Sequence, residues 1–490
     1  MRQIFPRKGN FTMTTPLTVT NVIDGKAVNG SSGEIRQIFN PSTGEVLTQL
    51  NESTVEDGDR AVAAARAAFP AWAARTPGAR SELLHRLVGV IEENIDDLAR
   101  LETLDAGKPT TVARGDELPG IAAALRHFAG AARTLAGQAA GEFVENNTSY
   151  VRREPLGVVL GITPWNFPLW QAVWKLGPAL AAGNTVVIKP AELTPLATTR
   201  FVELAQEVLP AGVLNVVHGT GGVIGDALVR HPEVNLVSFT GSTAAGRTIA
   251  AAAGGAPKRL ILELGGNAPV IVYDDIDLQA ALPILTNGVL FNAGQECMSS
   301  TRLLVSEKVH DQFVTALANS LQAAKVGDAS DPETVLGPLI SQRQRDRVVK
   351  LVDGRPSSAQ VVTGGNAVDR PGFFFEPTLI TGVSQDDELV QEEIFGPVAT
   401  VQTFTDEANA IAKANAVDQG LAASVWTRDI GRALRTVNAV QAGVVWVNNH
   451  MAVGPEGPLD GYEGSGYGRE GGTAGLEEFT QLKQVIVNLS

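Results

Sequence analysis

The chain of 490 residues contains a single cysteine, Cys297, and only six histidines. One thiol cannot form a disulfide within the chain, and it excludes zinc or iron–sulfur sites that need several thiolates, so we expect no metal centre. Basic residues are also few, since 39 Lys and Arg stand against 53 Asp and Glu and leave a net charge of −14. An acidic chain has the wrong sign to bind a phosphate backbone, so no nucleic-acid partner is expected.

The sequence also lacks a secretory signal and a clear membrane span. Its first 16 residues are partly basic but contain no apolar run of seven or more, so we expect a disordered tail over 1–20, with translation beginning at Met1 or Met13. Residues 156–174 carry no charge over 19 positions, which approaches the length of a span. Two prolines and two amide side chains interrupt this stretch, so we expect a cytoplasmic protein without a membrane partner.

The pattern of apolar residues divides the chain into parts. Residues 54–140 repeat apolar side chains at spacings of three and four, which predicts helices. From 157 to 263, short β-branched runs alternate with helical stretches, including 168–182 and 243–253. Such alternation predicts a parallel sheet with ligands at the carboxyl ends of its strands, as in nucleotide-binding domains. A second alternating series over 267–450 predicts another α/β domain.

Two segments look like strands without a helix nearby: residues 141–156 and the terminal QLKQVIVNLS. Because unpaired strand edges promote association, we expect these strands to pair with each other or with another subunit.

Three glycine-containing or polar turns follow predicted strands. In GTGGVIG, the glycines at 219, 221 and 225 have one residue too many for a dinucleotide fingerprint, which favours a tight turn over a pyrophosphate site. In TGSTAAGR, Gly241 permits a sharp turn and Ser242 or Thr243 can cap the next helix, giving either a phosphate site or a plain capped turn. Lys189 and Glu192 could bind a ribose or form a surface ion pair.

Cys297 lies in the polar turn FNAGQECMSSTR. Lone cysteines often serve only for packing, and a free thiol is mostly protonated at neutral pH, so a nucleophilic role requires a base or a positive field. Glu263 ends the apolar strand LILE, where loss of solvent could raise its pKa and make it a general base or leave it purely structural. Asn166, between two prolines, suits an oxyanion donor or a turn residue.

Taken together, these segments resemble the aldehyde dehydrogenase superfamily from about residue 20 to residue 485. The markers, in order, are PWNFP at 164–168, VIKPAE at 187–192, FTGSTAAG at 239–246, LELGG at 262–266, GQEC at 294–297, EEIFGP at 392–397 and SGYGRE at 465–470. The resemblance implies a Rossmann-like NAD-binding domain over 21–140 and 159–266 and a catalytic α/β domain over 267–471. It further implies a small β oligomerisation element over 141–158 and 472–490, whose hairpin pairs with the terminal strand of a neighbouring subunit in a homodimer or homotetramer.

The resemblance also implies roles for particular residues. Cys297 would attack the aldehyde, Asn166 would hold the oxyanion, Glu263 would activate water against the thioester, and Lys175 and Glu470 would relay the proton. NAD would be the cofactor and NADP a poorer one, because the Glu192 carboxylate repels a 2′-phosphate. The implied cofactor contacts are Ile162, Thr163, Pro164, Trp165, Lys189, Glu192, Gly221, Gly225, Phe239, Gly241, Ser242, Leu264, Glu393 and Phe395.

Stretches such as RHFAGAAR and TSYVRREPLGVV are most similar to the bacterial γ-aminobutyraldehyde and betaine-aldehyde branch. The implied substrate tunnel comprises Asp116, Phe167, Trp170, Gln171, Trp174, Glu296, Met298, Val453 and Leu459, with Glu117 beside its mouth. Acidic residues and tryptophans favour an ω-amino aldehyde, whereas Val453 and Leu459 stand where an aromatic cage for betaine aldehyde would need rings. Apolar aldehydes remain an alternative, and a non-catalytic relative is a third. Asp460 and Glu463 depart from the usual Gly and Lys.

Overall fold

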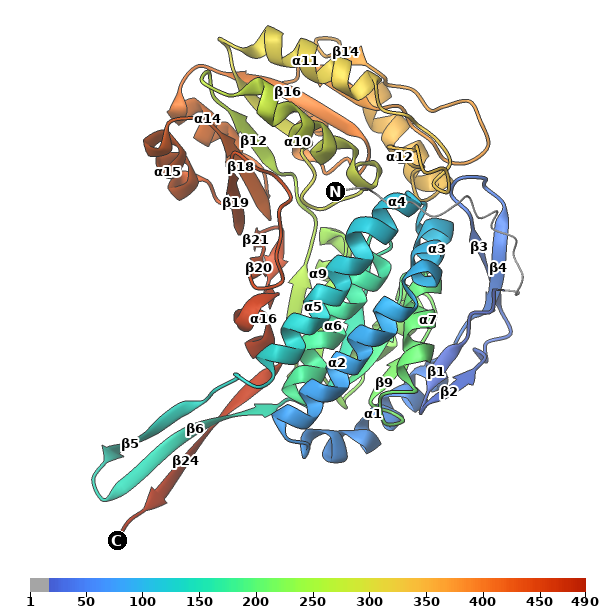
Figure 1. Ribbon diagram of the computed structural model, residues 1–490, viewed down its shortest axis with the longest axis vertical. Coiled ribbons are helices and arrows are strands. Elements are labelled where there is room, and N and C mark those ends of the chain that lie inside the picture. The colour runs from blue at the N-terminus through green and yellow to red at the C-terminus, as the bar shows by residue number, and fades with distance from the viewer. Residues whose placement is uncertain (1–16) are drawn as a thin grey trace, which may run out of the picture.

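A computed structural model describes residues 17–490, and two large sheets with separate helices account for most of them (Figure 1). The predicted tail over 1–20 falls mainly outside the described residues, but Val19 lies inside the predicted range and is buried in the first core. The first sheet has, in spatial order, β2 (Lys26–Val28), β1 (Asn21–Ile23), β9 (Leu214–Val216), β8 (Thr185–Lys189), β7 (Val158–Ile162), β10 (Val234–Thr240), β11 (Arg259–Glu263) and β22 (Gly466–Tyr467).

The five strands from β9 to β11 run parallel, as the alternating pattern predicts. Their register aligns the carboxyl ends, because Ile162 pairs with both Lys189 and Phe239, and Thr240 pairs with Glu263. Every residue of β7 and β8 is buried, which explains why both strands are rich in β-branched residues. The predicted site residues at these strand ends therefore meet along one edge of the sheet.

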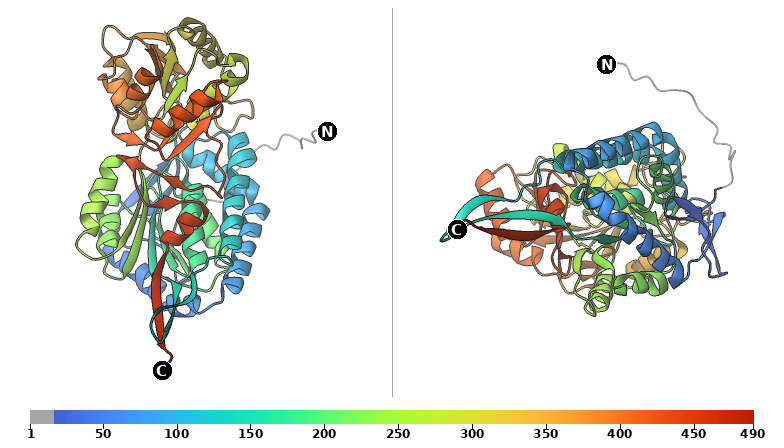
Figure 2. Two further views of the ribbon diagram at one scale, coloured as in Figure 1. Left: turned by 90° about the vertical axis from the view of Figure 1, so that its left-hand side faces the viewer. Right: turned by 90° about the horizontal axis from the view of Figure 1, so that it is seen from below.

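Helices cover both faces of this sheet (Figures 1 and 2). They are α1 (Val55–Ala73), α2 (Pro77–Glu93), α3 (Ile95–Ala106), α4 (Thr110–Val112), the π-helical turn η1 (Ala113–Glu117), α5 (Leu118–Ala131), α6 (Pro168–Ala182), α7 (Leu196–Ala205), α8 (Asp226–Arg230) and α9 (Thr243–Ala253). Helices α6 and α9 have the bounds predicted from the sequence. Helix α6 packs between the sheet and α2 and α5, so burial accounts for the absence of charge over 156–174. Within residues 17–490, no helix has the length and apolar character needed to cross a membrane.

The second sheet and its helices form their own core. Its strands, in spatial order, are β14 (Gln360–Thr363), β15 (Thr378–Thr381), β16 (Val398–Phe404), β13 (Arg302–Ser306), β12 (Pro269–Val272), β18 (Ala422–Trp426) and β19 (Val444–Val447), parallel except for β14. Its helices are α10 (Leu278–Leu290), η3 (Phe291–Gly294), α11 (His310–Gln322), α12 (Gln342–Asp353), α13 (Glu388–Gln391), α14 (Glu407–Ala414) and α15 (Ile430–Ala439). Strand β22 lies within the predicted range 267–471 but joins the first sheet.

A three-stranded sheet projects from the body, with the order β24 (Thr480–Asn488), β6 (Asn147–Pro155) and β5 (Gln138–Val144) (Figure 1). Of the two pairings expected for these segments, the structure shows the one within the chain. The terminal strand β24 pairs with β6 along nine residues, from Thr480 opposite Pro155 to Asn488 opposite Asn147. Helix α16 (Gly472–Glu478) directs the chain back to the hairpin.

Smaller elements complete the fold. They are the hairpin β3 (Ile35–Phe39) and β4 (Val46–Asn51), the π-helical turn η2 (Gly221–Gly225), and the short pairs β17 (Gln419–Gly420) with β21 (Tyr462–Glu463) and β20 (Leu459–Asp460) with β23 (Arg469–Glu470). Asp460 forms an ion pair with Arg469 across the last of these pairs.

Candidate active site

One large cavity lies where the carboxyl ends of the first sheet meet loops of the second. Its volume of about 1140 Å³ exceeds that of most single-ligand pockets, so it can hold a cofactor together with a small substrate. Of the predicted site residues, those that line it are Asp116, Pro164, Trp165, Asn166, Phe167, Trp170, Gln171, Trp174, Glu192, Gly241, Ser242, Glu263, Leu264, Glu296, Cys297, Met298, Glu393, Phe395, Val453 and Leu459. The folded chain thus gathers residues from six of the seven motifs.

The other predicted residues lie outside the lining. They are Ile162, Thr163, Lys175, Lys189, Gly221, Gly225, Phe239 and Glu470. All of these except Gly221 are buried. Within the described part of the chain, no three His, Cys, Asp or Glu side chains are grouped as a metal site.

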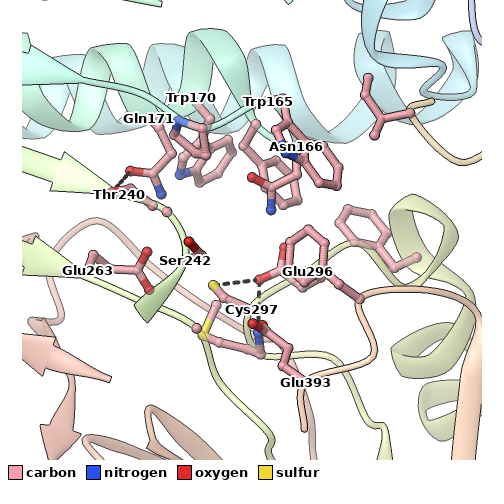
Figure 3. A pocket seen from close by; sticks show the side chains of 18 of the residues that line it. Trp165, Asn166, Trp170, Gln171, Thr240, Ser242, Glu263, Glu296, Cys297 and Glu393 are labelled. Atoms are coloured by element: carbon pink, nitrogen blue, oxygen red, sulfur yellow. Dashed lines mark hydrogen bonds between the residues drawn. The ribbon is translucent and has the colours of Figure 1, made fainter. Parts of the chain in front are cut away.

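Cys297 follows a constrained turn. Asn292 and Ala293 have φ of 49° and 56°, a left-handed conformation that is uncommon for residues with a Cβ. Gly294 also has a positive φ of 68°, and a Cβ there would lie 2.1 Å from the carbonyl oxygen of Gly396. This turn directs the Cys297 thiol into the cavity, toward the carboxyl groups of Glu263 and Glu296 (Figure 3).

The surroundings of Cys297 favour its protonated form. Burial raises the pKa of the thiol well above its usual range, and the nearby carboxyls of Glu263, Glu296 and Glu393 raise it further. The thiol Sγ donates a hydrogen bond to Glu296 Oε1 at 3.5 Å (Figure 3). The ionisable groups that act most strongly on the pKa of Cys297 are therefore carboxyls.

Glu263 terminates β11 beside Cys297. Burial raises the pKa of its carboxyl well above the usual range, and the charge of Glu470 raises it further. The direction of this shift is the one expected from the apolar strand. Its Oε2 atom is buried and has no hydrogen-bond partner among residues 17–490, so one carboxyl oxygen is free to accept a proton or bind a water molecule.

A buried ion pair lies behind Glu263. Lys175 Nζ donates to Glu470 Oε1 at 2.8 Å, to Thr240 Oγ1 at 2.6 Å and to Gln171 Oε1 at 3.0 Å. An ammonium group has three protons, so Lys175 is fully bonded. Because the amide oxygen of Gln171 accepts from Lys175, its NH₂ group is turned toward the cavity (Figure 3).

Asn166 lies in the loop between β7 and α6. Its Nδ2 donates to the carbonyl oxygen of Gln295 at 2.9 Å, and Asn292 Nδ2 donates to the Asn166 carbonyl at 3.0 Å. These bonds connect the loop of the first sheet to the turn that carries Cys297. One of the two Nδ2 protons of Asn166 remains available to a ligand.

The cofactor side of the cavity is formed by residues after β7, β8 and β10. Glu192 Oε1 accepts a hydrogen bond from the Gly221 N–H at 2.6 Å and lies 3.6 Å from Lys189 Nζ. The ion pair considered from the sequence is therefore present, but Lys189 is only 2% exposed, so its ammonium is buried and does not lie on the surface. The segment GTGGVIG forms the π-helical turn η2 leading into α8 rather than the predicted tight turn.

Three further features could receive a dinucleotide. Ser242 caps α9, since its Oγ accepts from the Ala245 N–H, so the helix N-terminus faces the cavity as predicted. Thr163 Oγ1 is buried without a hydrogen-bond partner in the described chain. Glu393 accepts from the Gly266 N–H at 3.2 Å, and a Cβ at Gly265 would lie 2.3 Å from Glu393 Oε2. The donors and acceptors therefore suit a ligand with phosphates and riboses.

The substrate side of the cavity is aromatic and acidic. Trp170 stacks on Trp174 with ring centroids 6.3 Å apart, and Phe167 stacks on Phe291 at 6.2 Å. Carboxyl groups of three residues line the same side: Asp116, Glu117 and Glu296. Val453 and Leu459 complete the apolar part of this wall.

Glu117 is held in a buried cluster behind the tunnel. Lys108 is completely buried, forms an ion pair with Glu117, lies 3.6 Å from Glu102 Oε2, and places its ammonium 4.3 Å from the centre of the Phe167 ring. Burial raises the pKa of Glu117 to about 8. The cluster therefore fixes the position of an acidic wall residue and of an aromatic one.

We expect Lys108→Met to lower the free energy of unfolding by about 3–5 kcal/mol, because it leaves buried carboxyls without their cation. Thermal and denaturant unfolding monitored by circular dichroism would measure the change. Lys325→Met, which removes an exposed cation paired with Asp331 and Glu333, should have little effect. Equal stability of the two variants would contradict the structural role of Lys108.

Several lining residues were not predicted from the sequence. They include Arg36, Thr240, Phe291, Gln344, Arg347 and His450. Phe291 and Thr240 lie within or next to predicted motifs, so the sequence could have indicated that they line the site. Arg36 comes from the β3–β4 hairpin, far from any motif in sequence, and nothing in its local pattern indicates a site.

Comparison with known proteins assigns this architecture to a family. The sequence model described as "Aldehyde dehydrogenase family" matches residues 28–485. The chain is 44% identical over 471 residues to an aldehyde dehydrogenase of Emericella nidulans, covering 95% of this chain and 94% of the relative. It is 40% identical to a betaine aldehyde dehydrogenase of Bacillus subtilis, covering 96% and 98%, and 41% identical to a phenylacetaldehyde dehydrogenase of Pseudomonas fluorescens, covering 95% of each chain.

A solved structure supports the same assignment. Betaine aldehyde dehydrogenase from Staphylococcus aureus, crystallised in complex with NAD⁺, is 40% identical and superimposes with a TM-score of 0.94, covering 96% of this chain and 95% of that one. The chain therefore belongs to the aldehyde dehydrogenase family, and it is an aldehyde-oxidising enzyme with the Rossmann-like fold of that family.

Proposed function

We propose that the protein oxidises an ω-amino aldehyde such as 4-aminobutanal to its carboxylic acid with NAD, through a thioester on Cys297. The observation that carries this proposal is the cavity in which Cys297 and Glu263 lie between a dinucleotide-like side and an acidic, aromatic tunnel. All three elements of such a reaction are present in one space: a nucleophile, a base and room for two ligands.

In this proposal Cys297 Sγ adds to the carbonyl carbon of the aldehyde. The oxyanion then accepts hydrogen bonds from the free Nδ2 proton of Asn166 and from the backbone N–H of Cys297. Bound NAD supplies the hydride acceptor that converts the adduct to a thioester. Glu263 takes a proton from water, which attacks the thioester, and the buried pair of Lys175 and Glu470 lies behind it to receive the proton.

The residues present fit NAD. The buried hydroxyl of Thr163, which has no partner, and the N-terminus of α9 at Ser242 offer donors to a pyrophosphate. Lys189 and Glu192 would bind the adenosine ribose, and Glu393 the nicotinamide ribose. The Glu192 carboxylate would repel a 2′-phosphate, so NADP would be a poorer cofactor.

Charge favours a cationic substrate. Asp116 and Glu296 contribute carboxyls to the substrate side, and Trp170 and Trp174 offer aromatic faces to an ammonium group. Val453 and Leu459 provide no rings to complete a cage for a quaternary ammonium, which favours a primary amine over betaine aldehyde.

An apolar aldehyde is the second candidate. The stacked pairs Phe167–Phe291 and Trp170–Trp174, together with Val453 and Leu459, form an apolar wall. The relative from Pseudomonas fluorescens named phenylacetaldehyde dehydrogenase also favours an aromatic substrate. A non-catalytic role is disfavoured because Cys297, Glu263 and Asn166 all face the cavity.

A panel of aldehydes tests the substrate. We expect kcat/KM with NAD to be at least about tenfold higher for 4-aminobutanal and 3-aminopropanal than for hexanal and benzaldehyde, a difference of about 1.4 kcal/mol in transition-state binding. NADH formation would be monitored by absorbance. Betaine aldehyde should react more slowly than the primary amines. Higher values for hexanal or benzaldehyde would contradict the cationic substrate and support the apolar one.

We also propose a homodimer or homotetramer built through the projecting sheet. Its outer strands expose large apolar side chains, including Phe143 at 80% and Leu482 at 62%. Exposed apolar strand edges of this kind are normally covered by another chain.

A further inference from the structure

Glu296 contacts the nucleophile directly. Its Oε1 accepts hydrogen bonds from Cys297 Sγ at 3.5 Å and from the Met298 N–H at 3.4 Å, while the residue is only 6% exposed (Figure 3). A carboxylate in this position favours the protonated thiol in two ways, as the acceptor of its proton and as a negative charge beside its sulfur.

The other charged groups around Cys297 act in the same direction. Glu263 and Glu393 are carboxyls, and both raise the pKa of the thiol. The cation that acts on Glu296 is Lys108, whose ammonium is already paired with Glu117 and Glu102. Nucleophilic cysteines are normally activated by positive surroundings, so the arrangement in the empty tunnel suppresses the reactivity of the thiol.

We propose that Glu296 holds Cys297 as an unreactive thiol in the empty enzyme, and that the ammonium group of a cationic aldehyde releases it by pairing with the Glu296 carboxylate. The S–H bond then loses its acceptor, the proton passes to water in the cavity, and sulfur keeps the electron pair with which it attacks the carbonyl. This inference rests on the proposed function, because it assigns to Glu296 the selection of cationic substrates at the step that activates the nucleophile.

In this role Glu296 does more than contact the substrate. An acidic side chain that only binds the amine would lower KM, whereas Glu296 also controls how much thiolate forms. Neutral aldehydes of the same length would enter the tunnel but leave the thiol protonated. The effect is therefore visible in the reactivity of the free enzyme, without any turnover.

Alkylation of the single thiol by iodoacetamide tests whether Glu296 suppresses the reactivity of Cys297. At about pH 8 we expect Glu296→Gln to be alkylated about tenfold faster than the wild type, corresponding to a thiol pKa about one unit lower. Burial raises the pKa of Glu296 to about 7, so near pH 6 the wild-type carboxyl is mostly uncharged and the two rates should converge. A variant that is alkylated at the wild-type rate or more slowly at pH 8 would overturn the inference.

Asp116→Asn provides the matched control. It removes the same charge from the mouth of the same tunnel, but the carboxyls that raise the pKa of Cys297 most are those of Glu263, Glu296 and Glu393. Its alkylation rate should equal that of the wild type. A rise equal to that of Glu296→Gln would show that total tunnel charge, and not the contact with Sγ, controls the thiol, and would also overturn the inference.

Ethylammonium chloride tests whether an ammonium group releases the thiol in the wild-type enzyme. At constant ionic strength it should accelerate alkylation of the wild type at pH 8, whereas ethanol at the same concentration should not. Glu296→Gln should show no acceleration. Absence of acceleration in the wild type, or equal acceleration in the variant, would overturn release by an ammonium group. Because these measurements need no aldehyde, they can fail while the proposed reaction stands, and the aldehyde panel can fail while they succeed.

Discussion

Replacing Cys297 with alanine should lower kcat/KM for every aldehyde by at least about a thousandfold, because the covalent step then has no nucleophile. No other thiol exists in the chain to replace it. The dinucleotide side of the cavity is built from residues after β7, β8 and β10, so the affinity for NAD should stay within about twofold of the wild-type value. NADH formation would measure the first quantity, and a titration of protein fluorescence with NAD the second.

Chemical modification provides a control for Cys297. Iodoacetamide should label one site per chain, and loss of activity should follow labelling in direct proportion. Measurable turnover in Cys297→Ala, or inactivation that lags behind labelling of the wild type, would assign the chemistry to another residue.

Changing Glu263 to glutamine should separate the two halves of the reaction. We expect a rapid burst of one NADH per active site, followed by a steady state slower by about 10²–10⁴-fold, since removal of a general base has effects of this size. The amide fills the same volume at the end of β11 but cannot take a proton from water. The thioester therefore accumulates, and stopped-flow absorbance together with intact mass would detect it.

The pH dependence of the wild type gives an independent check on Glu263. Burial raises the pKa of its carboxyl, so the group is protonated and inactive as a base below that pKa. The rate of thioester hydrolysis should therefore increase with pH through the raised pKa, and Glu263→Gln should lose this dependence. An unchanged steady state in the variant would remove Glu263 from hydrolysis of the thioester.

Local sequence patterns were sufficient to predict the five parallel strands of the first sheet and the helices between them. The helix bounds at 168–182 and 243–253 follow from apolar spacing, capping residues and flanking glycines, all of which act over a few positions. The raised pKa of Glu263 was also predictable, because the strand LILE indicates burial. The order of motifs then identified the superfamily and placed its site residues on the correct side of the sheet.

Long-range contacts could not be predicted in this way. The hydrogen bond between Cys297 and Glu296 depends on the side-chain rotamer of Glu296 and on the constrained turn at 292–294. Burial of Lys108 beneath Phe167 joins segments about 60 residues apart, and Arg36 reaches the cavity from a hairpin with no motif. Pairing of β24 with β6 within one chain was one of two possibilities that the sequence left open.

That pairing sets the order in which the protein can be completed. Strand β6 cannot pair with β24 until Thr480–Asn488 has been synthesised, more than 300 residues later. Strand β22, on the edge of the first sheet, likewise comes from Gly466–Tyr467. A growing chain that has not yet released these two segments from the ribosome therefore exposes both edges, and the fold closes only after they emerge. Removal of Thr480–Asn488 should impair assembly far more than its small share of the chain suggests.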